Sequence, residues 1–81
     1  MLTSTPATFT SNIDNDIVIE LLYREKKTFA VFHEDEFKEM ASFINTFGID
    51  SFKFNRETRH PISEDQQLAI YKAIFLAYST H

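Results

Sequence analysis

The chain contains no cysteine and only one glycine among its 81 residues. The lack of cysteine excludes disulfide bonds, thiolate catalysis, iron–sulfur clusters and cysteine-ligated zinc sites. The phosphate-binding loop, the dinucleotide-binding fingerprint and the nucleophile elbow each need two or more glycines, and the sequence has only Gly48. The familiar nucleotide-dependent enzyme classes are therefore excluded as well.

Long apolar runs are missing and basic residues are few. No uninterrupted apolar segment approaches the roughly 20 residues that span a bilayer. The N-terminus has neither the basic nor the apolar region of a secretory signal. Eight Lys and Arg against twelve Asp and Glu give a formal net charge of -4, which disfavours broad contact with nucleic acid or an anionic membrane. We therefore expect a cytoplasmic protein with no membrane partner.

Aromatic residues, in contrast, are abundant. Nine Phe and three Tyr supply large side chains for a small core. The length suits one domain, which we place at residues 13–81. Residues 1–12 are rich in Ser and Thr and lack periodicity, so they predict a flexible N-terminal tail, or a loose strand if Phe9 finds a pocket.

The first half of the domain predicts a β-hairpin followed by a helix. Apolar and polar residues alternate over 17–23, and residues 28–32 are rich in β-formers, so the polar segment 24–27 is the expected hairpin connection. Apolar residues then recur at helical spacing over 34–47. Gly48 stands where the left-handed residue that ends a helix is expected.

The second half predicts one more strand and one more helix. Residues 49–55 alternate as a short strand. Ser63 and Gln66 match the S-x-x-Q capping box, so the second helix is expected from Glu64 to about Tyr78. The order β-β-α-β-α predicts an α+β fold, with a three-stranded, mainly antiparallel sheet and two helices packed on one face.

The second predicted helix is apolar around most of its circumference. An arc about 160° wide, at roughly 100° per residue, is expected to face the core. The arc holds Leu68, Ile70, Tyr71, Ile74, Phe75 and Tyr78. Beside it, Ala69, Ala73 and Ala77 form a ridge of small residues. The ridge either docks on the first helix or, with Leu76, forms a self-association patch in a homodimer.

The sequence offers no convincing catalytic or metal-binding set. The segment 33–36, "HEDE", lacks the two ligands four residues apart that a helical metal site uses. Ser63 lies near His60 but is explained as a helix cap. We expect no enzyme, no metal and no cofactor.

Two charged clusters are candidate binding sites. Four acidic residues at the start of the first helix form a candidate partner-binding surface: Glu34, Asp35, Glu36 and Glu39. Four basic residues before the second helix form a candidate anion-binding site: Lys53, Arg56, Arg59 and His60. Beside free helix-start amides, such side chains bind phosphate or carboxylate groups. The alternative for the basic cluster is a solvated loop whose arginines pair with nearby carboxylates.

These features predict a small, acidic, non-enzymatic protein-protein interaction module. We expect a stand-alone regulator or inhibitor, of the kind that mobile elements encode, which occupies a partner's surface with its acidic residues. The alternative is a nucleic-acid-associated regulator that uses the basic segment 53–60.

The predicted sheet adds a reason to expect a partner or a homodimer. With both helices on one face, the other face carries Val18, Leu22 and either Phe29 or Phe32. Exposed apolar surface of this kind is typical of interaction sites. The N-terminal tail, a second copy or another protein is expected to cover it.

Overall fold

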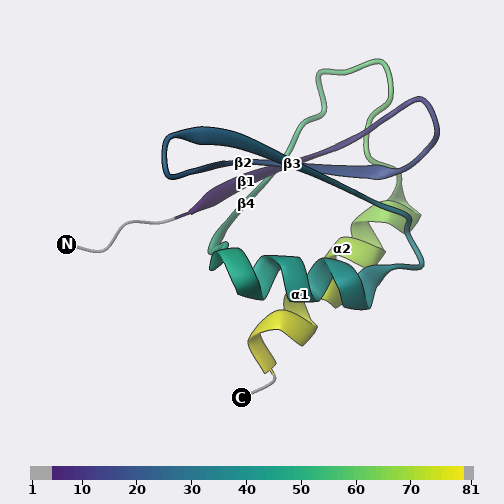
Figure 1. The fold of residues 1–81 in the computed structure, drawn as a ribbon. Coiled ribbons are helices and arrows are strands. Elements are labelled where there is room, and N and C mark those ends of the chain that lie inside the picture. The colour runs from purple at the N-terminus through teal and green to yellow at the C-terminus, as the bar shows by residue number, and fades with distance from the viewer. Residues whose placement is uncertain (1–4, 80–81) are drawn as a thin grey trace.

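The computed structural model describes residues 5–79, which form a layer of two helices packed on a sheet (Figure 1). The elements in chain order are β1 (Pro6–Ser11), β2 (Ile17–Tyr23), β3 (Lys26–Phe32), α1 (Phe37–Phe47), β4 (Ser51–Phe54) and α2 (Glu64–Ser79). β1, β2 and β3 are antiparallel neighbours, and β4 joins parallel to β1, which gives the order β3-β2-β1-β4. The predicted α+β fold is confirmed, and its sheet has four strands rather than three.

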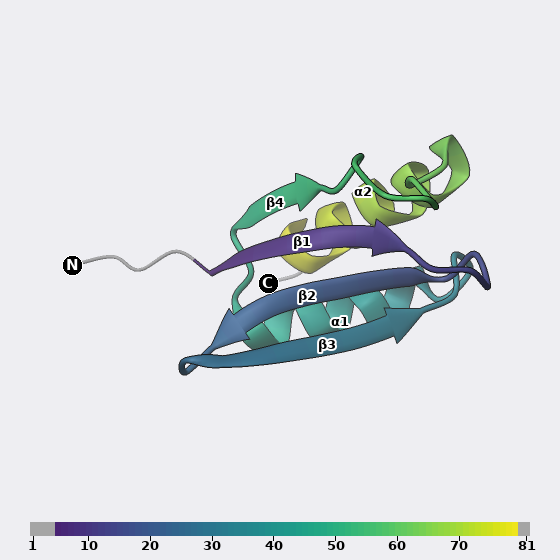
Figure 2. The same ribbon diagram turned by 90° about the horizontal axis from the view of Figure 1, so that it is seen from above.

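The additional strand comes from the segment that the sequence predicts as a flexible tail or a loose strand. Residues 6–11 lie inside the sheet between β2 and β4, so the flexible-tail expectation is corrected there (Figure 2). Phe9 is fully buried, and its ring centroid lies 5.9 Å from that of Phe52 and 5.8 Å from that of Phe54. Burial of this ring, with backbone pairing on both sides, offsets the entropy lost on ordering the strand. The first four residues of that tail lie outside the described residues.

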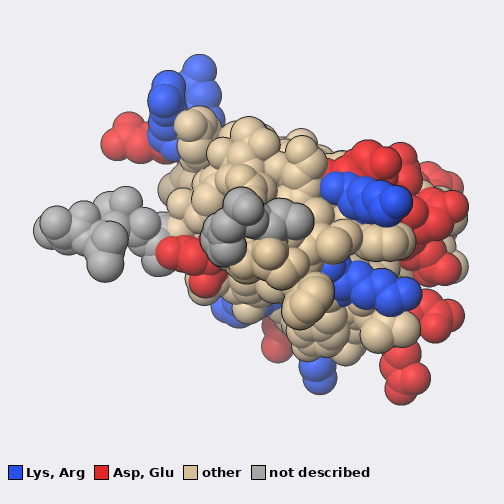
Figure 3. All heavy atoms as spheres, turned by 90° about the horizontal axis from the view of Figure 1, so that it is seen from below, with Lys and Arg blue, Asp and Glu red and all other residues tan. Residues whose placement is uncertain are grey.

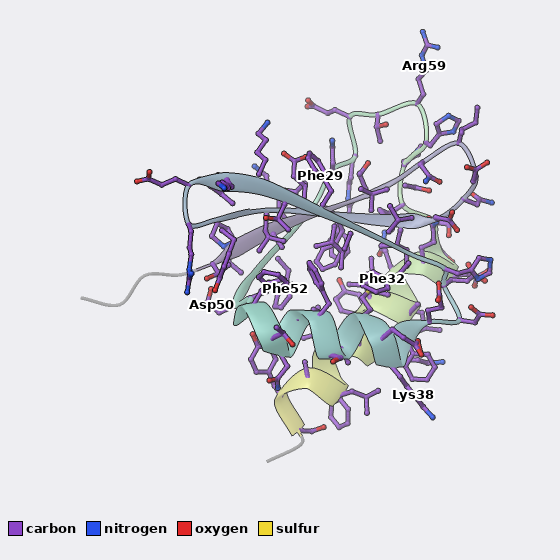
Figure 4. All side chains as sticks on the ribbon, viewed as in Figure 1. Phe29, Phe32, Lys38, Asp50, Phe52 and Arg59 are labelled. Carbon is purple, nitrogen blue, oxygen red and sulfur yellow. The ribbon has the colours of Figure 1, made fainter. Side chains whose placement is uncertain are left out.

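The register of the strands divides the sheet into a covered and an uncovered face. Facing the helices are Ala7, Phe9, Ser11, Ile17, Ile19, Leu21, Ala30, Phe32, Phe52 and Phe54. α1 lies beneath β2 and β3, and α2 lies beneath β1 and β4 (Figure 2). Phe32 and Phe52 point between the sheet and α1, whereas Phe29 lies on the uncovered face (Figure 4). The open choice between Phe29 and Phe32 is thereby resolved in favour of Phe29.

α1 begins later than predicted and ends where predicted. Its first residue is Phe37, so Glu39 is the acidic residue of its first turn. The three acidic residues before Phe37 lie ahead of the helix rather than in it. Gly48 has a left-handed φ of 63°, and its N–H donates to the carbonyl of Asn45 at 3.2 Å. This confirms the predicted C-terminal role of glycine, which adopts that conformation without a Cβ clash.

The predicted capping box starts α2. The Ser63 hydroxyl accepts from the Gln66 backbone N–H at 3.1 Å, and Gln66 Oε1 accepts from the Ser63 N–H at 2.9 Å. The same buried glutamine donates through Nε2 to Ser11 Oγ at 3.0 Å and to the Asn15 carbonyl at 2.8 Å. One side chain therefore caps α2 and joins it to the end of β1 and the β1–β2 turn.

α2 buries only part of the face that the sequence predicts, because Ile70 is completely buried and Ile74 packs against the core while the rest of that face is exposed. Ala69, Ala73 and Ala77 are buried within the chain, on the helix that packs against α1. Small side chains let two helices approach closely, and Asn45 of α1 donates through Nδ2 to the Ala77 carbonyl at 2.9 Å. Four residues of the predicted core face are instead 45% to 71% exposed: Leu68, Tyr71, Phe75 and Tyr78. The alanine ridge thus packs on α1 within the chain, which is the first of the two predicted alternatives. The other alternative, a homodimer contact through these alanines, is wrong.

Candidate functional site

The exposed side of α2 and the start of α1 line a shallow hollow of about 370 Å³. Its lining residues, which we call the helix-side patch, are Phe37, Leu68, Tyr71, Lys72, Phe75 and Leu76. Lys72 is the charged member, and its Nζ lies 5.7 Å from the centre of the Phe37 ring. Contiguous exposed apolar side chains of this size are typical of interaction sites. The patch is therefore the first candidate for a functional surface.

The exposed residues of α2 repeat with the spacing of a helix-docking seam. Leu68, Tyr71, Phe75 and Tyr78 are separated by three, four and three residues. Alternating steps of three and four keep side chains on one stripe that a second helix can pack against. This spacing was the sequence signal for the patch, but the same residues also fit a core face.

Carboxylates gather at one end of the helix-side patch. A second hollow, of about 300 Å³, shares Phe37, Leu68 and Lys72 with the first. Its remaining lining residues are Glu34, Asp35, Asp65 and Ala69. The helix side has acidic groups gathered at one end, with basic side chains lying among them, beside uncharged surface (Figure 3). We call Glu34, Asp35 and Asp65 the acidic end of the patch.

Only two of the four residues of the predicted acidic cluster line this second hollow. Glu34 and Asp35 border the patch, and Asp65 joins them from α2, a residue outside the predicted acidic cluster. Glu36 and Glu39 are exposed nearby without lining the hollow. The helix–helix packing that brings the starts of α1 and α2 together has no local signal in the sequence.

Hydrogen bonds organise the turn that carries the acidic end. Glu36 Oε1 accepts from the His33 backbone N–H at 2.7 Å, and His33 Nδ1 lies 2.9 Å from Asp35 Oδ1. The hydrogen bond to Asp35, and then the charge of that carboxylate, raise the pKa of His33 above its ordinary value. Protonation of His33 lowers the net negative charge at this end of the patch.

The four basic candidates are spread over β4 and the following loop. Lys53 and Arg56 line a hollow of about 480 Å³, together with the carboxylate residue Glu57. Arg59 and His60 are exposed outside it, and Arg59 points away from the body of the molecule (Figure 4). The structure thus brings two of the four together, in a hollow of mixed charge. The start of α2 meanwhile carries the Ser63 cap and two acidic residues in its first turn.

The uncovered face of the sheet carries a second exposed apolar group. Leu22, Phe29 and Val31 are each more than half exposed, and half-buried Val18 lies directly opposite Val31. We call these four residues the sheet-face stripe. Phe9, the expected anchor of a covering tail, lies in the core on the other face.

The structure contains no metal cluster or membrane span among the residues it describes. Within residues 5–79, no three His, Asp or Glu side chains form a group that could hold a metal ion. In the same part of the chain, no helix is both long and apolar enough to cross a bilayer. Comparison with known proteins gives no match, whether to a family model, a curated protein or a solved structure. The exposed surfaces of the molecule are therefore the basis for its functional assignment.

Proposed function

We propose that the protein is a non-enzymatic binding module that docks its helix-side patch onto a basic surface of a protein partner. The observation that carries this proposal is the exposed apolar seam of α2 beside a group of carboxylates. Burying a large apolar side chain contributes about 1.5–3 kcal/mol. The carboxylates add preference for basic partners and faster encounter. Such a module regulates or inhibits by occupying its partner's surface.

The chemistry of the patch favours recognition over catalysis. Five of its six lining residues are apolar, and the sixth is Lys72. Acyl or phosphoryl transfer needs a nucleophile, a base and an orienting group that converge on one point. The patch has an apolar centre and a charged border, and protein interfaces generally have this composition.

The test compares variants in crosslinking capture from the native cell, followed by affinity measurement with the purified partner. Phe75→Lys places a cation in the middle of the seam. Simultaneous substitution of Glu34, Asp35 and Asp65 by Lys reverses the acidic end. We expect both variants to weaken binding at least about tenfold, through the lost apolar contact and the reversed charge. Added salt should weaken binding by the wild-type protein.

A matched control reverses three exposed carboxylates elsewhere. Replacing Asp14, Glu25 and Glu57 by Lys makes the same change in net charge away from the patch. We expect this variant to keep the partner that the acidic-end variant loses. A partner that survives both the Phe75→Lys and the acidic-end substitutions contradicts the proposal.

A further inference from the structure

We propose that the partner segment that docks on the helix side is an amphipathic α-helix of about four turns, which carries Lys or Arg in its last turn and lies antiparallel to α2. This inference rests on the proposed function and names the kind of partner that the helix-side patch fits. The shape of the helix side and the position of its charges select this occupant.

Three hollows form one continuous track along the outer side of α1 and α2. The hollow of the helix-side patch shares Phe37 and Leu68 with the hollow at the acidic end. It shares Leu76 with a third hollow of about 370 Å³, which Asn45 and Thr46 of α1 also line. Both helices begin at the same end and run in the same direction, so the track follows them along their length (Figure 1). α2 has 16 residues and is therefore about 24 Å long, which matches a docked helix of about four turns.

The apolar side chains of the track have the spacing that a helical partner recognises. Leu68, Tyr71, Phe75 and Tyr78 are separated by three, four and three residues, and each is at least 45% exposed. A helix packs against such a stripe through its own apolar residues at the same spacing. An extended strand binds instead to unpaired backbone groups at a sheet edge, whereas the backbone groups inside α2 are bonded within the helix. The exposed side of α2 therefore fits a helix better than a strand.

Charge complementarity favours cations at one end of the partner helix. The acidic end brings together the carboxylates of Glu34, Asp35 and Asp65 where α1 and α2 begin. Lys72 lines the same hollow and Lys38 lines the third one, so carboxylates outnumber ammonium groups among the residues that line the track. Lys or Arg of a partner form charge-assisted hydrogen bonds with such carboxylates. The partner helix is therefore expected to place its basic residues at the acidic end.

The helix dipole determines the direction of the partner helix. The first backbone N–H groups of α1 and α2 give the acidic end partial positive charge as well as carboxylates. The last turn of a helix carries partial negative charge, so Lys and Arg stabilise a helix most in that turn. A helix that brings its last turn to the acidic end therefore opposes the dipoles of α1 and α2 and supplies cations to the carboxylates. Basic residues in its first turn would destabilise the partner helix itself.

A second copy of the chain does not supply such a helix. In a two-fold contact with antiparallel α2 helices, the acidic end of one copy meets the last turn of the other copy's α2. Among the described residues that turn carries no basic side chain, and it ends at Ser79. Burial and then the charge of Asp50 raise the pKa of Tyr78, so a carboxylate lies near this turn. Carboxylates would therefore meet carboxylates, and a parallel contact would place the two acidic ends together.

NMR titration of the ¹⁵N-labelled protein with four synthetic peptides tests the inference. The first peptide has the length of α2, Leu residues alternately three and four positions apart, a background of Ala and Gln, and Lys residues in its last turn. The second has the same composition with the Lys residues in its first turn. The third has Ser in place of Leu, and the fourth has Pro at two central positions. We expect the first peptide to shift the amide signals of α2 and the acidic end, and each other peptide to bind at least about tenfold more weakly.

Protein variants assign the binding to the two parts of the patch. Phe75→Lys should abolish binding of the first peptide, and Tyr71→Lys replaces it if its amide spectrum shows an unfolded chain. The acidic-end variant should lose the preference for the first peptide over the second, whereas the matched control with Lys at Asp14, Glu25 and Glu57 should keep it. A preference that persists in the acidic-end variant reflects peptide helicity alone and overturns the inference. Failure of the first peptide to bind, equal binding of the proline peptide, or loss of the preference in the matched control also overturns it.

The proposed function and the helical partner fail in different experiments. A captured partner that requires Phe75 and the acidic end, but crosslinks to the patch through a loop or a strand, retains the proposed function and overturns the helical partner. A captured partner that survives both the Phe75→Lys and the acidic-end substitutions overturns the proposed function, and the inference with it. Crosslinks between the patch and a helix with a basic last turn support both.

Discussion

Gln66 takes part in four hydrogen bonds, three of them through its side chain. Two form the cap with Ser63, one reaches Ser11 of β1, and one reaches the Asn15 carbonyl in the β1–β2 turn. Gln66→Ala removes both the cap acceptor for Ser63 and the donor to Ser11 and Asn15. Because the site is buried, the stranded polar groups are expected to lower the free energy of unfolding by about 2–3 kcal/mol. Urea unfolding measures this, with Gln67→Ala, one position along the helix, as the matched control. Equal stability of the two variants contradicts the linking role.

The turn before α1 gives the protein a defined pH response at His33. Its pKa is raised by the hydrogen bond that its ring donates to the Asp35 carboxylate and by the charge of that carboxylate. A raised pKa in the folded state means that this contact stabilises the fold below the ordinary value of about 6.5, and that the stabilisation is lost as pH rises through the folded pKa. NMR titration should show the His33 pKa falling in Asp35→Asn and staying in place in Glu39→Gln. An unchanged titration in Asp35→Asn contradicts the assigned contact.

At the scale of whole elements, local chemistry explains which features were predictable. Ser63 with Gln66, and Gly48, act through hydrogen bonds and backbone angles within a few residues, so their patterns predicted where α2 begins and α1 ends. Alternation likewise predicted the two faces of β2 and β4. The strand β1 was harder, because Phe9 is its one large apolar residue and its partners lie far along the chain.

α2 shows why the candidate site was only partly predictable. Apolar residues surround most of this helix, so hydrophobicity alone ranks the large side chains as core. The seam with α1 instead selects small residues, because helices approach closely only where side chains are short. The larger residues Leu68, Tyr71 and Phe75 are left outside and form the patch. Side-chain volume therefore decides which residues of α2 enter the seam with α1, while Ile70 is buried in the core as its hydrophobicity predicts.

The assignment of the two faces of α2 predicts opposite effects for one kind of substitution. Ala73 is completely buried, so Ala73→Glu forces a carboxylate into the seam with α1. The expected loss is about 3–5 kcal/mol, most of the stability of a small domain. Phe75→Glu, two positions along, introduces the same residue on the exposed face and should leave the thermal transition near that of the wild type. Circular dichroism melting compares the two, and a stable, wild-type-like Ala73→Glu contradicts the packing.

At the scale of the whole molecule, the sheet separates two surfaces of different character. The helix side combines an apolar seam with the acidic end, whereas the uncovered sheet face carries the sheet-face stripe, the Glu20–Lys27 pair and Lys53. Because the two surfaces lie on opposite sides of a thin molecule, occupation of one leaves the other accessible.

The position of β1 makes the start of the chain essential for the whole fold. β1 lies between β2 and β4, and it is the described strand that holds β4 in the sheet. A chain that begins at Asn12 loses Phe9 from the core and separates β4 from the β2–β3 hairpin, so we expect no cooperative thermal unfolding. A chain that begins at Thr5 keeps every described strand pairing and should melt like the full-length protein. Differential scanning calorimetry distinguishes the two, and a cooperative, full-sized transition in the chain from Asn12 would show that residues 6–11 are dispensable for the fold.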